Sequence, residues 1–175
     1  METIIEHLLT NTYKDEMISY IAMHPEAFDE VIKLAISEKP PYSWRAAWVL
    51  WSIMEENDKR VQIHIKSIID SISTKKDNQQ RELFKVLHKM ELNEEYAGQV
   101  FIICVDVWEK IHKKPSVRMN ALHLMVKIAQ KYPELSNEIE LLTQDQYLDS
   151  MSQAVYKSIT KLKKRLDGYI VTPKF

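Results

Sequence analysis

Glycine is scarce in this sequence, which holds only Gly98 and Gly168 among its 175 residues. The usual share of glycine in a globular protein is about 7%. Tight β-hairpins and phosphate-binding loops need glycine because they place residues at positive φ. The sequence therefore disfavours a β-sandwich and a parallel α/β sheet, and it contains no GxGxxG, GxxxxGK[ST] or GxSxG motif.

Cysteine and long apolar runs are scarce as well. The single thiol, Cys104, cannot form an internal disulfide, and no CxxC motif occurs. The best apolar stretch, residues 96–105, has about ten residues, whereas a membrane-spanning helix needs about twenty. The first residues carry Glu2 and Glu6 and no early Lys or Arg, unlike a secretory signal. We therefore expect a cytoplasmic protein with no membrane partner.

Chemistry-bearing clusters are also missing from the sequence. Six histidines are spread along the chain without an HExxH motif. A metal site needs three or four converging ligands, so we expect no metal and no other cofactor. Cys104 shares an apolar stripe with Val100 and Val107, which favours packing over nucleophilic chemistry. No catalytic residue can be named, and the sequence predicts a protein that is not an enzyme.

What the sequence does contain is helical periodicity. Apolar residues recur at a spacing near 3.6 in segments separated by short polar breaks. Pro25 and Pro133 each stand at an expected first helical position and are followed by an acidic residue. The β-branched run 100–107 is ambiguous by itself, but its helical spacing continues through Trp108 and Ile111. We therefore predict a buried helix there and an all-α fold.

Two series of helices alternate along the chain at a mean period of about 36 residues. The first series comprises apolar segments that begin at Phe28, Val61, Val100 and Leu135, and the second comprises segments that begin at Trp44, Gln80, Val117 and Val155. One helix pair cannot bury both of its apolar stripes, but stacked pairs share a continuous core. The repeat therefore predicts about four to five stacked helix pairs.

The most regular segment is Arg118-Met119-Asn120-Ala121-Leu122-His123-Leu124, followed by Ile128. It resembles the second helix of a HEAT repeat, with an early Arg, a small residue, and then Leu and Ile. Residues 44–48 match more loosely. The resemblance covers residues 25–166, and it implies an all-α, right-handed α–α superhelix, a solenoid of the HEAT or armadillo type.

The ends of the chain depart from this repeat. Residues 3–10 and 14–23 read as short helices out of register with the later units, and the end units of a solenoid are atypical. We therefore expect a single domain over residues 1–175, made of capping helices at 1–24, repeats at 25–166 and a tail at 167–175.

Several second-series helices carry a basic residue beside an inward-facing position. Arg45, Arg81 and Arg118 each lie about 100° round the helix from that position, where they can border a surface formed by the second helices. We expect a non-catalytic protein-interaction or scaffold module that binds another protein, or an acidic peptide segment, on this face. The candidate partner-binding residues are Arg45, Arg81, Arg118, Lys85, Trp44, Trp48, Lys157 and Lys161. Reversing the charge of Arg81 and Arg118 is expected to abolish binding and leave the fold intact.

Four alternatives stay open. The stripe of Trp44, Trp48 and Trp51 is typical of a core, and the alternative is a binding surface, because Trp often stays partly exposed. A nucleic-acid-binding function would use the same basic track. Trp108 with Asp106 also resembles, at a distance, the DNA glycosylases built on a HEAT-like stack. Self-association through the apolar end of the chain would make a homo-oligomer.

Overall fold

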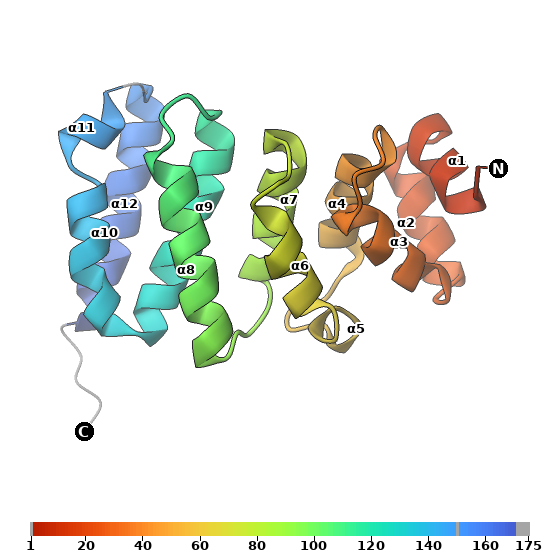
Figure 1. Cartoon of the computed structure of the whole chain (residues 1–175), viewed down its shortest axis with the longest axis horizontal. Helices are drawn as coiled ribbons and strands as arrows, with labels where there is room; N and C mark the ends of the chain where they lie inside the picture. Colours follow the sequence, from red (N-terminus) through yellow and green to blue (C-terminus); the bar gives the residue numbers. More distant parts are fainter. Residues whose placement is uncertain (1, 150, 171–175) are drawn as a thin grey trace. The chain divides into compact units, whose positions relative to one another are not determined.

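The computed structural model describes residues 2–149 and 151–170, with side chains up to Leu166. All regular elements in these ranges are helices, which confirms the predicted all-α class. The chain divides into two compact units, Met1–Tyr96 and Ala97–Phe175 (Figure 1). The expectation of a single domain stays a prediction, and each unit is described by itself.

The described residues of the first unit form seven complete helices: α1 (Ile4–Asn11), α2 (Lys14–Met23), α3 (Ala27–Ile36), α4 (Tyr42–Ile53), α5 (Lys59–Gln62), α6 (Ile65–Ile72) and α7 (Asp77–His88). They alternate between two layers. Helices α1, α3 and α6 follow one another in one layer, and α2, α4 and α7 follow one another in the other (Figure 1). Helix α4 contacts α1, α2, α3 and α7, so it is the centre of this unit.

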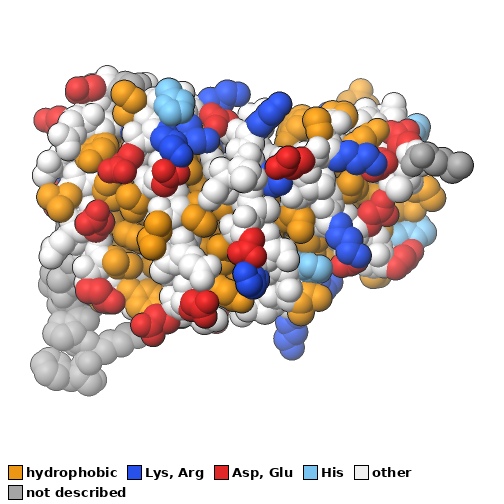
Figure 2. All heavy atoms as spheres, in the orientation of Figure 1, with side chains coloured by type: hydrophobic (Ala, Val, Ile, Leu, Met, Phe, Trp, Pro, Cys, Tyr) orange, Lys and Arg blue, Asp and Glu red, His pale blue; other side chains and the backbone are white. Residues whose placement is uncertain are grey.

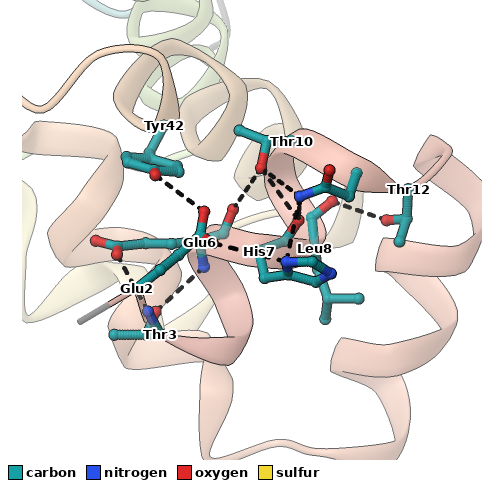
Figure 3. A network of polar contacts seen from close by, with 9 residues as sticks. Glu2, Thr3, Glu6, His7, Leu8, Thr10, Thr12 and Tyr42 are labelled. Atoms are coloured by element: carbon teal, nitrogen blue, oxygen red, sulfur yellow. Dashed lines mark hydrogen bonds and ion pairs between the residues drawn. The ribbon is translucent and has the colours of Figure 1, made fainter.

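Helix α1 is held to α4 by a network of polar side chains (Figure 3). Thr3 and Glu6 form a capping box, in which each side chain accepts a hydrogen bond from the backbone N–H of the other. Glu6 is buried and pairs with Lys39, whose hydrogen bond lowers the pKa of the Glu6 carboxyl. The hydroxyl of Tyr42 donates to Glu2 across 2.9 Å. The N-terminal helix is therefore anchored by ion pairing and hydrogen bonds as well as by its apolar face.

The apolar stripes of the first unit meet between the layers. Val31 and Ile32 from α3, Leu50 from α4 and Phe84 from α7 are fully buried. Burial of one such side chain contributes about 1.5–3 kcal/mol. Packing of the stripes, more than local helix propensity, therefore stabilises these short helices.

The second unit contains α8 (Glu94–Glu109), α9 (Pro115–Lys131), the short 3₁₀ helix η1 (Pro133–Leu135), α10 (Ser136–Leu142), α11 (Asp145–Leu148) and α12 (Gln153–Ile170). Helix α8 starts three residues before the boundary with the first unit. In Figure 1, α8 and α10 lie in front of α9 and α12. Helix α9 packs on η1, α10 and α12.

The core of the second unit includes two large side chains that carry hydrogen-bond donors. Trp108 is fully buried, and its indole N–H donates to the carbonyl of Leu142 across 2.6 Å. Arg118 is also fully buried, with its guanidinium carbon 4.7 Å from the centroid of the Trp108 ring. It donates to the carbonyls of Trp108 and Tyr147 across 2.8 Å each. These bonds link α8, α9, α10 and α11.

The observed helices confirm both predicted series. The first series corresponds to α3, α5 with α6, α8, and η1 with α10; the second corresponds to α4, α7, α9 and α12. The short helices expected at residues 3–10 and 14–23 are α1 and α2. Helix α12 continues to Ile170, past the expected end of the repeats, and the rest of the predicted tail, residues 171–175, lies outside the described residues.

Candidate functional site

An aromatic row runs along one face of α4. Trp44, Trp48 and Trp51 follow one another at helical spacing, and all three are half-buried. The opposite face of α4 is fully buried through Ala46 and Leu50. The three indoles therefore lie at the edge of the core, with part of each ring open to solvent.

A basic row on α7 lies beside the aromatic row. Arg81, Lys85 and Lys89 are four residues apart and so share one face of the helix. The ammonium nitrogens of Lys85 and Lys89 lie 4.7 and 5.3 Å from the centroid of the Trp51 ring. Both distances are in the range of cation–π attraction. Packing of α7 against α4 thus brings the two rows together.

A further lysine approaches the indoles from α2. The ammonium nitrogen of Lys14 lies 4.6 Å from the centroid of the Trp48 ring and 6.0 Å from that of Trp51. On α4 itself, the guanidinium of Arg45 lies 5.5 Å from the Trp44 ring. We call the whole set the tryptophan–lysine surface; its members are Lys14, Trp44, Arg45, Trp48, Trp51, Arg81, Lys85 and Lys89.

A buried carboxylate holds part of the basic row in place. Glu82 is 1% exposed, and it accepts hydrogen bonds from Arg81 and Lys85 at 2.8 and 3.0 Å. Lys89 donates to the carbonyls of Trp51 and Met54, at the C-terminal end of α4. These three basic groups are therefore fixed by the protein itself.

Lys14 and Arg45 are the basic groups of this surface that make neither an ion pair nor a hydrogen bond with another described residue, whereas Lys89 donates to two backbone carbonyls. The Nε atom of Arg45 is buried and has no hydrogen-bond partner among the described residues. A bound carboxylate would satisfy cations of this kind with charge-assisted hydrogen bonds. The described residues therefore leave the hydrogen-bonding capacity of Lys14 and of the Arg45 Nε unused, whereas they hold Arg81, Lys85 and Lys89 in place.

Arg118 does not lie on the surface predicted for it. It was predicted to border a solvent-exposed face, but it is 0% exposed and donates to carbonyl groups in the core of the second unit. The burial of Arg118 argues against the expectation that the pair Arg81→Glu and Arg118→Glu leaves the fold intact, because Arg118→Glu would bury an unpaired carboxylate. Lys157 and Lys161 are exposed on α12 of the second unit, one helical turn apart.

The structure therefore brings together five of the eight predicted residues, all in the first unit: Trp44, Arg45, Trp48, Arg81 and Lys85. Lys14 and Lys89 were not among the predicted residues. Lys89 continues the four-residue spacing of Arg81 and Lys85, so the sequence held a signal for it. Lys14 lies on a helix remote in sequence, and only the packing of α2 against α4 places it over Trp48.

The residues considered for catalysis or nucleobase binding, Cys104, Asp106 and Trp108, lie in different environments. Cys104 is buried, and desolvation raises the pKa of its thiol well above the usual value. Asp106 is exposed and pairs with Lys110 at 2.6 Å. The indole of Trp108 is buried, so its faces are not open to a nucleobase. Among the described residues, no three His, Cys, Asp or Glu side chains converge as metal ligands, and every helix is too short or too polar to cross a lipid bilayer.

Comparison with known proteins gives one match. A family model described as a HEAT repeat domain matches residues 2–166, which includes α1 and α2 as well as the repeats expected from residue 25 onward. No curated protein and no solved structure matches the chain. The match agrees with the two alternating series of helices in the structure.

Proposed function

The chain belongs to the HEAT repeat domain family, and from this premise we propose that it is a non-catalytic interaction module that binds an acidic segment of another protein on the tryptophan–lysine surface. HEAT repeats generally act as protein-interaction scaffolds, so the family supports the class of function. The surface and the acidity of the partner are our own proposal.

One observation carries the proposal. The ammonium groups of Lys14 and Lys85 are held over the half-exposed rings of Trp48 and Trp51. A partner that brings carboxylates would pair with Lys14, and the positive charge of Lys85, although paired with Glu82, would add to the attraction. Apolar side chains of the partner would cover the open parts of the indoles. Trp and Arg are the residue types that most often dominate the binding energy of an interface. We therefore expect an acidic segment with aromatic or aliphatic anchors.

A peptide is favoured over a nucleic acid by the charge balance of the same surface. The carboxylate of Glu82 pairs with both Arg81 and Lys85, which reduces the positive charge that a phosphate backbone would meet. Non-specific nucleic-acid binding depends on neutralising several phosphates at once. A peptide with two or three carboxylates needs fewer unpaired cations on the protein than a nucleic-acid backbone does.

The proposal can be tested by peptide display on the full chain. Random peptides of about 15 residues, roughly the reach of one helix-sized segment, are selected against the immobilised protein, and the enriched peptides are measured by fluorescence anisotropy. We expect enrichment of Asp and Glu around an aromatic or Leu anchor.

The binding-deficient variant combines Lys14→Glu with Lys85→Gln. Lys14 is the first residue of α2, where an acidic side chain suits the helix dipole, and Lys85→Gln leaves Arg81 paired with Glu82. The matched control combines Lys59→Glu with Lys66→Gln in the same unit; Lys66, like Lys85, has one carboxylate partner. Thermal unfolding establishes that both variants are folded.

The selected peptides should bind the double variant at least about tenfold more weakly, a loss of about 1.4 kcal/mol or more in binding free energy. Their affinity for the control should stay within about twofold of the native value. Enrichment of peptides without acidic residues contradicts the proposal, and so does equal binding by both variants. Tight, steeply salt-dependent binding of a single-stranded oligonucleotide in place of any peptide would assign the surface to nucleic acid instead.

A further inference from the structure

Helix α8 carries two apolar stripes, and only one of them faces the core of the second unit. Val100, Cys104 and Val107 form the buried stripe. Ile102 lies outside it and is 71% exposed, and Val105, three residues later, is half-buried. A helix that is apolar on more than one face is typically covered on more than one face. We therefore expect the second stripe of α8 to be covered by another molecule.

This second stripe lines a groove between α8 and the segment formed by η1 and α10. The groove has a volume of about 580 Å³, and Ile102 and Val105 from α8 with Leu135 from η1 supply apolar lining. Figure 2 shows hydrophobic side chains gathered over α8 and α10, with acidic side chains around them. Contiguous apolar surface with a polar rim marks interaction sites on folded proteins.

The rim of the groove is acidic. Asp106 and Glu109 from α8 line one side, and Glu134 and Glu138 from η1 and α10 line the other. Asp106 pairs with Lys110 at 2.6 Å. Glu134 and Glu138 make no ion pair with another described side chain, and no Lys or Arg is among the residues that line this groove. Carboxylates on both sides of an apolar lining are complementary to a cationic partner.

We propose that this groove binds a basic amphipathic helix of a partner protein. Leu- or Ile-type side chains at successive turns of that helix lie against Ile102, Val105 and Leu135, and flanking Lys or Arg side chains pair with the carboxylates of the rim. This is helix-in-groove recognition, in which apolar anchors supply affinity and charge selects the partner. The proposal is independent of the tryptophan–lysine surface, which has the opposite charge and lies in the other unit.

The probe is a fluorescein-labelled amphipathic helix of about 18 residues built from Leu and Lys. A helix of the same length built from Leu and Glu serves as the control for charge. Anisotropy titrations use the full chain at about 0.15 M salt, where exposed long-range charge effects are screened beyond about 8 Å. Ile102→Asp tests the apolar lining, and Glu134→Lys with Glu138→Lys tests the rim.

Matched controls come from exposed positions of the first unit. Ile63 is 79% exposed, so Ile63→Asp places the same change on a comparable surface residue. Glu55 and Glu56 are both exposed, and reversing both alters net charge as much as the rim variant does. Because all substituted side chains in the rim and control variants are exposed, we expect them to fold. If Ile102→Asp does not fold, the rim variant alone decides the outcome.

We expect the Leu–Lys helix to bind the native chain and to bind both groove variants at least about tenfold more weakly, while the controls stay within about twofold. Absence of binding overturns the proposal. It is also overturned if the Leu–Glu helix binds as tightly, or if the controls weaken binding as much as the groove variants. A concentration-dependent dimer that Ile102→Asp converts to monomer in sedimentation would assign the groove to a second copy of the chain instead.

Discussion

Arg81 and Arg118 occupy the same register in successive second helices, yet the two regions around them differ. The Arg81 side chain on α7 is 29% exposed and pairs with its neighbour Glu82. Arg118 on α9 is fully buried, and it donates to the carbonyls of Trp108 and Tyr147. The short helix α11, which carries Tyr147, lies between the two helices of the pair that follows α9, and the equivalent connection after α7, between α8 and α9, holds no helix. Helical register therefore sets the direction of a side chain, whereas the segment that joins the neighbouring helices decides whether that side chain reaches solvent.

The exposed surfaces of the two units differ in the same way. In the first unit, cations gather over half-buried indoles, and Lys14 and Arg45 make no ion pair with another described side chain. In the second unit, carboxylates flank the apolar groove beside α8. A fold assembled from similar helix pairs therefore presents surfaces of opposite charge, and our two proposals assign them to partners of opposite charge.

The largest effect is expected from replacing the buried arginine. Arg118→Met keeps much of the side-chain volume but leaves the carbonyls of Trp108 and Tyr147 without their charged donor, so we expect a loss of about 3 kcal/mol in the free energy of unfolding. Arg81→Met, at the same register, removes a partly exposed ion pair and should cost about 1 kcal/mol or less. Urea unfolding followed by circular dichroism measures both. Similar losses for the two variants would remove the distinction between the regions.

A smaller effect is expected from the cap of α5 in the first unit. The Asp58 carboxyl is buried, and the hydrogen bond from Arg60 lowers its pKa to about 2. Because the folded pKa is below the unfolded value, Asp58 stabilises the protein above about pH 4, and this contribution is lost as the pH falls toward 2. Asp58→Asn should cost about 1–2 kcal/mol at pH 7, since the half-exposed Arg60 is screened by solvent.

Unfolding of the native chain and of Asp58→Asn between pH 7 and pH 2 checks this expectation. The difference in stability between them should narrow below about pH 4 and nearly vanish near pH 2. A constant difference across this range would show that Asp58 acts through packing or hydrogen bonds that do not depend on its charge.

The smallest effect is expected from His123 in the second unit, and it falls in a different pH window. Burial lowers the pKa of the His123 imidazole, and the positive charge of Arg165 lowers it further. The folded state therefore favours the neutral ring, and stability declines as the pH falls below the unfolded value of about 6.5. The native chain should lose some stability between pH 7 and pH 5, and His123→Gln should not. Equal pH dependence of the two proteins over this interval would contradict the assignment.

The fold was largely predictable because its signals are local. Pro133 stands at the first position of η1, Pro25 lies two residues before α3 begins, and apolar spacing near 3.6 identifies the buried face of each helix. The order of helix pairs then followed from the repeat of about 36 residues. The ambiguous β-branched run on α8 proved to be a helix, as its continuation through Trp108 predicted.

The candidate site was predictable only in part. Trp44, Trp48, Arg81 and Lys85 were identified from spacing within single helices, and the structure brings them together with Trp51. Lys14 was missed because its approach to Trp48 depends on how α2 packs against α4. The acidic groove beside α8 was missed for a similar reason, since its carboxylates come from separate elements and gather only after folding.

The sequence by itself determined that this chain is a stack of helix pairs, because periodicity and helix breaks depend on neighbouring residues. The tertiary structure alone decided that Arg118 is buried, that lysines from α2 and α7 meet over the tryptophans of α4, and that carboxylates of α8, η1 and α10 flank one groove. Each of these outcomes depends on contacts between residues far apart in the chain, and the pattern within a single helix does not specify such contacts.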